Sequence, residues 1–512
     1  MIRLDGESLT IDDVVRVARE DEPVALTSDA RERVRASRER VESVVDTDEA
    51  VYGVTTGFGD LVNTRIPRDK REELQANLVR SHATGAGRPL EREEVRALLL
   101  TRANALSKGY SGIRESVVDL LIAMLNEGVH PVVPSRGSLG ASGDLAPLAH
   151  VAVVLIGEGE ADYEGEWLSG GEALARAGFE PVTLQAKEGL ALINGTQLTV
   201  GLAALLVHDA ERLLLTADAA GALTTEVTMG SVVACDPAIQ RVRPHSGQAE
   251  SAANVQRFTR DSAVVESHRN CDRVQDAYSI RCLPQVHGAV RDAVAHLREA
   301  VEIELNSATD NPLVFPNGEV DPRASGGDAA DIVSGGNFHG APLSHRLDYV
   351  AGALTDLASI SERRTDRLLN PHIQEAHLPP YLARNAGTES GLMIAQYTAA
   401  SLLAECRATG RAGTDSTPVS GGQEDHVSMS ATAAYGARRV LENVRQVVAV
   451  ELLCAAEAAE YVEESLGTGT TALYEAVREL VPPLSGDRSL AGDIETLAAL
   501  VVSEEIENRI AD

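Results

Sequence analysis

Apolar residues recur every three or four positions along most of the chain, which is the spacing of one face of an α-helix. The leucines between 198 and 214 share one face, and similar stripes run through 286–305, 343–357 and roughly 430–460. Such stripes predict several helices of about 20 to 40 residues that bury one face in a long bundle. The stripes stay in phase across single glycines, so separate short helices are the weaker alternative.

The first 190 residues have a more mixed pattern. Residues 1–25 alternate in short β-like pieces, and Thr27 or Ser28 predicts the start of a charged helix over roughly 28–45. Helical spacing returns near 70–80, 92–108 and 113–127, whereas Gly-rich segments at 50–65 and 131–145 predict loops. We therefore expect a mainly α protein with a smaller mixed N-terminal part (1–190) and a long-helix bundle (191–512). One continuous domain is the alternative.

Composition and charge narrow the classes of partner. With 44 % hydrophobic and 24 % charged residues the chain is globular, and with 3 % aromatic residues its core must consist of small side chains. The net charge of −31 argues against binding nucleic acid or anionic membranes, which need clustered cations. Lys70, Lys108 and Lys187 are the only lysines. An acidic, lysine-poor chain predicts a halophilic protein, adapted to a salt-rich cytoplasm.

Cysteine usage and the absence of sorting motifs indicate the compartment. The five cysteines are odd in number and scattered, which predicts reduced thiols in a cytoplasmic protein. We find neither a secretory signal nor an apolar run of about 18 residues that would span a membrane. The histidines lack metal-binding spacing, so we expect no metal.

The segment Gly137–Leu145 carries the most unusual chemistry. It reads GSLGASGDL, and it lacks the lysine and the spacing of a phosphate-binding loop. A plain Gly-rich turn before a helix capped by Asp144 is one interpretation. In the other, the amide nitrogen of Gly143 attacks the carbonyl carbon of Ala141, and two waters are lost, one of them carrying the Ser142 hydroxyl. The product is a five-membered ring with an exocyclic methylene, which is a strong electrophile.

The run GSLGASGDLAPLAH at 137–150 resembles the signature of the aromatic amino acid ammonia-lyases. Six further motifs of that family follow the same order: VYGVTTGFG at 51–59, SHATGAG at 81–87, INGTQ at 193–197, VQDAYSIRCLPQVHG at 274–288, SGGNFHG at 334–340 and QEDHVSM at 423–429. Ser81-His82 and the stretch 423–426 look like the histidine ammonia-lyase branch. The resemblance spans roughly residues 45 to 450.

The resemblance implies an L-aspartase-like fold, a homotetramer with sites built from several subunits, and the cofactor 4-methylidene-imidazol-5-one (MIO) formed from Ala141, Ser142 and Gly143. The implied reaction removes ammonia from L-histidine to give trans-urocanate, the first step of histidine degradation. Either the amine or the aromatic ring of the substrate adds to the methylene. We favour the amine, because addition there makes it a better leaving group.

Site residues are also implied by the resemblance. Tyr52 matches the catalytic tyrosine that removes the β-proton, and Arg281 matches the arginine that pairs with the substrate carboxylate. His82 and Glu424 match residues that bind the imidazole ring, and they favour histidine over phenylalanine as the substrate. Without the resemblance, each would pass for a packed or surface side chain.

Further positions complete the implied site. Asn194 and Tyr278 match groups near the ring carbonyl and the substrate amine, where donors stabilise developing charge. Gln275 and Phe338 match other pocket residues, and Asp144 either assists cyclisation or caps a helix.

Three alternatives differ in activity. Another MIO enzyme, either a phenylalanine or tyrosine lyase or an aminomutase, is disfavoured by Ser81, His82 and Glu424. A helical lyase of the fumarase and aspartase type lacks the Ala-Ser-Gly loop. A non-catalytic helical scaffold would not need Tyr52, Arg281 and the intact loop together.

We expect activity and assembly to require high salt, because ions screen the repulsion among the excess carboxylates. Turnover and oligomeric mass measured over a series of salt concentrations test this. Strong activity in dilute buffer would contradict it.

Overall fold

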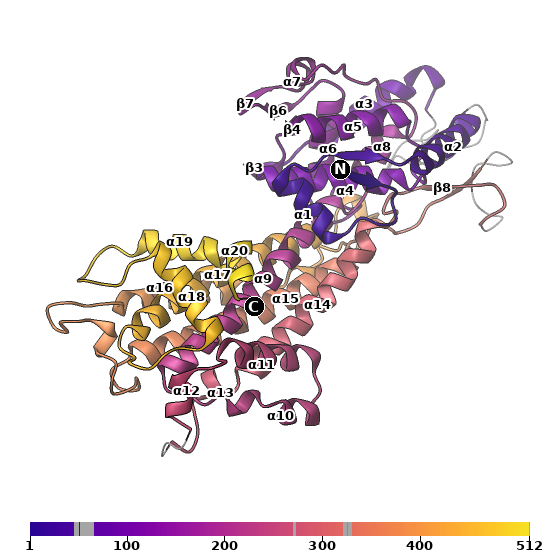
Figure 1. The fold of residues 1–512 in the computed structure, drawn as a ribbon. Helices are drawn as coiled ribbons and strands as arrows, with labels where there is room; N and C mark the ends of the chain where they lie inside the picture. Colours follow the sequence, from indigo (N-terminus) through magenta and orange to yellow (C-terminus); the bar gives the residue numbers. More distant parts are fainter. Residues whose placement is uncertain (46–50, 52–65, 270–272, 321–324, 326–329, 511–512) are drawn as a thin grey trace. The chain divides into compact units, whose positions relative to one another are not determined.

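The computed structural model describes residues 1–45, 51, 66–269, 273–320, 325 and 330–510. It is mostly helical, which confirms the predicted fold class. The chain forms two compact units, each assembled from three stretches of sequence (Figure 1). Unit 1 comprises 1–205, 298–348 and 411–435, and unit 2 comprises 206–297, 349–410 and 436–512. The division at residue 190 stays a prediction about domains.

Unit 1 combines short helices with small sheets. Its helices are α1 (Ile11–Glu20), α2 (Ser28–Val45), α3 (Arg71–His82), α4 (Arg92–Ser107), α5 (Glu115–Glu127), α6 (Leu145–Leu155), α7 (Gly170–Arg176) and α8 (Glu188–Ile193). The strands are β1 (Ile2–Leu4), β2 (Val24–Leu26), β3 (Ala86–Pro89), β4 (His130–Pro131), β5 (Pro134–Arg136), β6 (Glu160–Tyr163), β7 (Glu166–Ser169), β8 (Leu313–Phe315) and β9 (Asp331–Val333).

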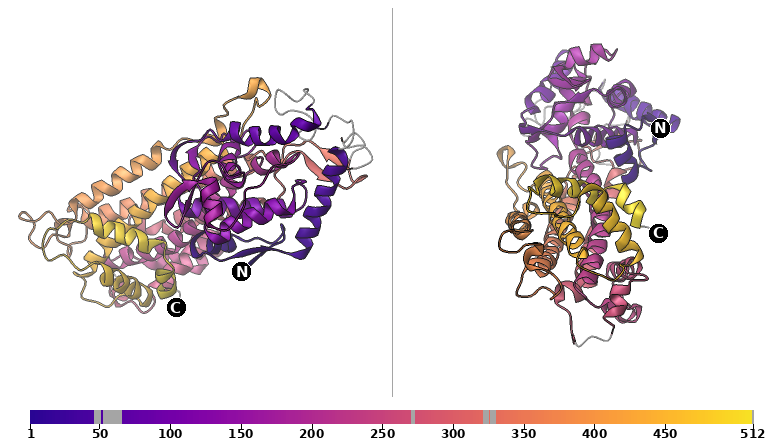
Figure 2. Two further views of the ribbon diagram at one scale, coloured as in Figure 1. Left: turned by 90° about the horizontal axis from the view of Figure 1, so that it is seen from above. Right: turned by 60° about the vertical axis from the view of Figure 1, so that its left-hand side comes forward.

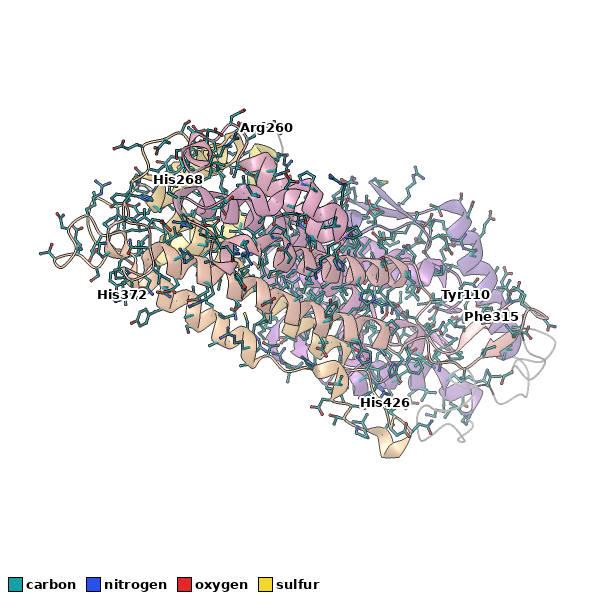
Figure 3. The ribbon with its side chains drawn as sticks, turned by 90° about the horizontal axis from the view of Figure 1, so that it is seen from below. Tyr110, Arg260, His268, Phe315, His372 and His426 are labelled. Carbon is teal, nitrogen blue, oxygen red and sulfur yellow. The ribbon has the colours of Figure 1, made fainter. Side chains whose placement is uncertain are left out.

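The strands of unit 1 form four small sheets. Strand β1 pairs with β2 in parallel, whereas β3–β5, β4–β6–β7 and β8–β9 are antiparallel. Phe315 of the β8–β9 hairpin packs against Tyr110 (Figure 3), and the centroids of the two rings are 5.3 Å apart. These sheets are too small to form a core of their own, so they pack on the helices.

The described residues of unit 2 form helices and loops but no strand. It contains α10 (Pro237–Val242), α11 (Ser246–Phe258), α12 (Ala263–Ser267), α13 (Tyr278–Arg281), α16 (Met393–Ala408), α18 (Thr468–Leu480), α19 (Ala491–Val501) and α20 (Glu504–Ile510). The last three pack against one another near the C-terminus (Figure 2). Four long helices contribute residues to both units: α9 (Gln197–Val227), α14 (Leu283–Leu305), α15 (Ala341–Leu369) and α17 (Ser430–Ala459).

The predicted apolar stripes lie inside these long helices. All six leucines of α9 between 198 and 214 are at most 1 % exposed, as are Leu343, Leu347, Val350, Leu354 and Leu357 of α15. Full burial of one such side chain stabilises the fold by roughly 1.5–3 kcal/mol. Alanines and valines fill the remaining core, in keeping with the aromatic-poor composition.

Most local predictions for the N-terminal part are confirmed. Helix α2 begins at Ser28, where the hydroxyl of Thr27 accepts a hydrogen bond from the Ala30 amide at 3.2 Å. Helices α3, α4 and α5 begin or end within about two residues of their expected positions. The predicted loop at 50–65 lies outside the described residues except for Val51.

The interpretation of residues 1–25 as β-like pieces was incomplete, because a helix separates the two strands. Thr10 and Asp13 form a capping box at the start of α1, and Asp21 ends the helix with a φ of +59°. The buried residues Ile11, Val14 and Ala18 lie on one helical face. Paired valines resembled strand composition, and the capping box was the signal that was missed.

Neither membrane spans nor disulfides occur in the described part of the chain. None of its helices is long and apolar enough to cross a membrane. The four described cysteines are all free.

Buried His130 on β4 gives unit 1 a predictable pH dependence. Burial, together with the positive charges of Arg96 and Arg92, lowers the pKa of His130 to about 4. Unfolding returns this pKa to about 6.5, so the unfolded chain binds the extra proton. Stability from the neutral ring is therefore complete above pH 6.5 and is lost as the pH falls towards 4.

We expect His130→Gln to reduce this loss of stability at acidic pH. Between about pH 7 and 4 the unmodified protein should lose on the order of 3 kcal/mol more unfolding free energy than the variant. Denaturant unfolding at constant high salt measures the difference. Parallel pH profiles for the two proteins would rule out this role of His130.

Candidate active site

The loop before α6 follows a sharply turned path that only glycine suits. Gly137, Gly140 and Gly143 have φ values of +142°, +64° and +75°. A side chain at Gly143 would also collide with Gly195, because its Cβ would overlap the Gly195 carbonyl oxygen. The third residue of Ala-Ser-Gly is thus constrained both by its backbone angle and by a neighbouring chain segment.

A turn after α8 holds this loop from both sides of Gly143. The side-chain amide of Asn194 donates a hydrogen bond to the Ser142 carbonyl at 3.0 Å. The Asp144 amide donates to the Gly195 carbonyl at 2.7 Å. Asn194 is 3 % exposed, and its Oδ1 has no hydrogen-bond partner among the described residues. A buried, unpaired acceptor beside the loop is typical of a site that is completed by a ligand.

The segment 424–430 covers the other side of the loop. The Ser142 hydroxyl donates to Oε1 of Glu424 at 3.1 Å, and the Met429 amide donates to the Leu139 carbonyl at 2.8 Å. Ser428 donates to the Gly140 carbonyl at 3.1 Å. Asn194 and Glu424, which are far apart in sequence, therefore both contact Ser142 of the loop.

Asp144 occupies the N-cap position of α6, but its carboxylate does not cap the helix. It accepts hydrogen bonds from the Ser138 hydroxyl and from the Thr199 amide, each at 2.8 Å. Complete burial raises its pKa, although these hydrogen bonds oppose the rise. The predicted N-cap position of Asp144 is confirmed, but its side chain does not cap the helix, because Ser138 and Thr199 of α9 take the place of the helix amides.

His82 ends α3, and a hydrogen bond fixes one of its ring nitrogens. Nδ1 lies 2.8 Å from the Leu78 carbonyl, which can only accept, so Nδ1 carries the proton. In this tautomer Nε2 is the acceptor nitrogen. The following segment is held near the loop, because the Gly85 amide donates to Nε2 of His150 on α6 at 3.0 Å and β3 pairs with β5.

Half-buried Phe338 precedes His339, whose ring stacks on that of His426 with 5.9 Å between the ring centroids. This contact joins the segment 334–340 to the segment that carries Glu424. Both histidines lie in motifs found in the sequence, at 334–340 and 423–429, but neither was expected to have a role.

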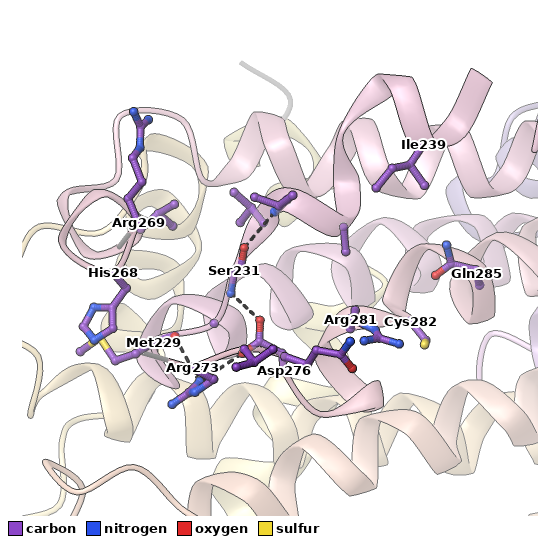
Figure 4. Close-up of a pocket in the computed structure, with 17 residues that line it drawn as sticks. Met229, Ser231, Ile239, His268, Arg269, Arg273, Asp276, Arg281, Cys282 and Gln285 are labelled. Atoms are coloured by element: carbon purple, nitrogen blue, oxygen red, sulfur yellow. Dashed lines mark hydrogen bonds and ion pairs between the residues drawn. The ribbon is translucent and has the colours of Figure 1, made fainter. Parts of the chain in front are cut away.

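The remaining candidates lie in unit 2. Gln275 and Arg281 line a cavity of about 720 Å³ together with Arg273 and Cys282 (Figure 4). The Arg281 guanidinium lies 5.0 Å from the centre of the Tyr278 ring, and Tyr278 is 69 % exposed. This group thus offers cations and an exposed phenol. Tyr52 lies outside the described residues.

Metal ligands do not gather anywhere in the described ranges of the chain. No three or more of their His, Cys, Asp or Glu side chains form a group that could hold an ion.

Arg102 is a feature of the site that the sequence reasoning missed. This residue of α4 is 1 % exposed and donates to the Asn194 carbonyl at 2.8 Å and to Oε1 of Gln197 at 2.7 Å. Its available signal was a charge inside the apolar run LLLTRANAL at 98–106. Buried arginines are rare unless they bind something specific.

A family model described as aromatic amino acid lyase matches residues 9–479 of this chain. The chain belongs to that family. It is 62 % identical over 510 residues to a probable histidine ammonia-lyase of Halobacterium salinarum, covering 99 % of this chain and 97 % of the relative. It is also 53 % identical to a histidine ammonia-lyase of Gloeobacter violaceus, covering 97 % and 95 %.

Solved structures of this lyase family share the fold. A tyrosine aminomutase from Streptomyces globisporus superposes with a TM-score of 0.93 at 40 % identity, covering 100 % of this chain and 98 % of that one. A histidine ammonia-lyase from Trypanosoma cruzi gives a TM-score of 0.90 at 38 % identity, with coverage of 100 % and 95 %. Fold alone therefore does not separate lyase from aminomutase.

The close approach of Gly143 to Gly195 predicts a position-specific loss of stability. Gly143→Ala should destabilise unit 1 by on the order of 2 kcal/mol more than Gly178→Ala, because only the former adds an overpacked contact. Gly178 is a matched control, with a φ of +86° and no atom within 4 Å of the position that a Cβ would take. Both changes belong in a Ser142→Ala background, so that neither protein can form a ring. Denaturant unfolding compares them, and equal losses would refute the steric constraint.

Proposed function

We propose that this protein is a histidine ammonia-lyase, a carbon–nitrogen lyase that converts L-histidine to trans-urocanate and ammonia. The contacts of Asn194 and Glu424 with Ser142 of the Ala-Ser-Gly loop carry the proposal. The names of the 62 % and 53 % identical relatives support it.

The residues around the loop fit an MIO group formed from Ala141, Ser142 and Gly143. Gly143 has no side chain to obstruct attack by its nitrogen, and the Ser142 hydroxyl that must leave points at Glu424. The amide of Asn194 already donates to the Ser142 carbonyl, which would become the ring carbonyl. The ring would supply an electrophilic methylene. Asn194 would stabilise negative charge on the carbonyl oxygen.

Recognition of the imidazole ring is assigned to Glu424 and His82. The Glu424 carboxylate can accept a hydrogen bond from one ring N–H, and Nε2 of His82 can accept one from the second N–H of an imidazolium ring, because Nδ1 of His82 faces the Leu78 carbonyl. A phenylalanine ring has no N–H to donate to either acceptor, so it would gain neither hydrogen bond. This arrangement favours histidine over phenylalanine or tyrosine.

The rest of the substrate is assigned to residues outside this cluster. Arg281 would pair with the carboxylate in a planar, bidentate manner, and Tyr278 would contact the amine. Gln275 and Phe338 would complete the pocket. Tyr52 would remove the β-proton, for which a phenol needs a lowered pKa or tight positioning.

Exposed apolar side chains support a proposal about assembly, and the net charge supports one about the solvent environment. We assign a homotetramer in a salt-rich cytoplasm. Tyr349 on α15 and Ile394 and Tyr397 on α16 are exposed large side chains, and they support association as candidate interface contacts. The net charge of −31 and the similarity to a Halobacterium salinarum relative support the halophilic character.

The substrate test uses the full-length protein at high salt with L-histidine, L-phenylalanine and L-tyrosine in parallel. Ultraviolet absorbance should grow only with histidine, as urocanate forms. Chromatography of each mixture detects a β-amino acid, which would instead identify an aminomutase. Cinnamate from phenylalanine would overturn the assignment of the substrate.

Glu424→Gln should slow histidine turnover by roughly tenfold or more, because a charge-assisted hydrogen bond is worth about 1.5–3 kcal/mol. Its thermal unfolding should change little, since Glu424 is only half-buried. Asp425→Asn is the matched control, an exposed neighbouring carboxylate. Equal turnover in the two variants would remove Glu424 from the site.

A further inference from the structure

Arg102 binds the turn that holds the Ala-Ser-Gly loop. Its guanidinium donates to the carbonyls of Ala191 and Asn194 and to Oε1 of Gln197. Gln197 is held in turn, since its amide donates to the Thr309 hydroxyl at 2.7 Å. Full burial lowers the pKa of Arg102 to about 10, so the group remains a cation at neutral pH. One buried cation therefore binds both the end of α8, at Ala191, and the Asn194–Gln197 turn that follows it.

This turn contacts the loop on both sides of the nitrogen that must react. Asn194 holds the carbonyl before Gly143, and Gly195 holds the amide after it, at 3.0 and 2.7 Å. Gly195 itself is confined, because a Cβ there would lie 2.8 Å from Nη1 of Arg102. Arg102 thus fixes two anchor points on either side of Gly143, whose φ is +75°.

We propose that Arg102 is a positioning residue for ring formation in this protein, acting through the Asn194–Gln197 turn. This role rests on the proposed function. The Gly143 nitrogen bonds to the Ala141 carbonyl carbon, and that oxygen leaves as water with the amide protons of Gly143 and Ser142. The Ser142 hydroxyl then leaves as water with the Ser142 Cα proton, which creates the exocyclic double bond. The two dehydrations consume no oxidant or reductant.

Both contacts with the turn are compatible with this chemistry. The Ser142 carbonyl and the Asp144 amide remain intact in the product, so the anchors hold before and after cyclisation. Fixing two anchors lowers the entropic cost of bringing a nucleophile onto a carbonyl carbon.

Arg96 on the same helix provides a matched control. It is 2 % exposed and donates to the carbonyls of Val17 and Leu125, both at 2.8 Å. Arg96 and Arg102 are therefore both buried guanidiniums that bind main-chain carbonyls, but only Arg102 contacts the turn at 191–197. Lysine at either position keeps the charge and loses the planar set of donors.

The test compares the unmodified protein, Arg102→Lys and Arg96→Lys as full-length chains at high salt. Mass spectrometry of the peptide that contains residues 141–143 follows the loss of two waters with time after synthesis. Ser142→Ala is the reference that cannot lose the second water, because alanine has no hydroxyl. Thermal unfolding is measured alongside. We expect Arg102→Lys to lose water about tenfold more slowly than Arg96→Lys at comparable stability.

Equal rates in the two lysine variants would overturn the role of Arg102 while leaving the proposed function intact. An unmodified protein that keeps both waters would overturn the ring, and with it this role. If Arg102→Lys does not accumulate as folded protein, Thr309→Val carries the test, because it removes only the hydroxyl that holds Gln197. It should slow dehydration about fivefold, and an unchanged rate would refute the proposal.

Discussion

The backbone contact between Gly143 and Gly195 is the constraint on which the rest of the site depends. It brings a loop and a turn so close that neither position tolerates a side chain. Two hydrogen bonds beside it fix the register, from Asn194 to Ser142 and from Asp144 to Gly195. A shift of one residue would move the Ser142 hydroxyl away from Glu424.

Several buried polar groups of unit 1 maintain this contact. Asp144 accepts from α9 through Thr199, and Arg102 binds the turn from α4. Burying a charge is costly unless strong hydrogen bonds compensate. Both charges are therefore better explained by local order at the loop than by stability alone.

The acidity of the chain is separate from the contacts at the loop. The net charge of −31 is a property of the whole chain, whereas Ser142 is contacted by one side-chain amide, that of Asn194, and one carboxylate, that of Glu424. Of the three lysines, Lys187 is fully buried and pairs with Asp310 at 3.1 Å. One of the few lysines in the chain, Lys187, is therefore an interior residue, and its compact ammonium is held by the carboxylate of Asp310.

By itself the sequence determined the helical class, the long apolar stripes, the α2 cap and the motif set that includes Ala141-Ser142-Gly143. These features depend on neighbours within a few positions, so local spacing is sufficient to find them. It did not reveal α1, the true partners of Asp144, the role of Arg102 or the stacking of His339 on His426. Those features depend on contacts between residues far apart in the chain. Only tertiary packing decides which buried donor meets which acceptor, because the partners of most buried polar groups come from distant parts of the chain.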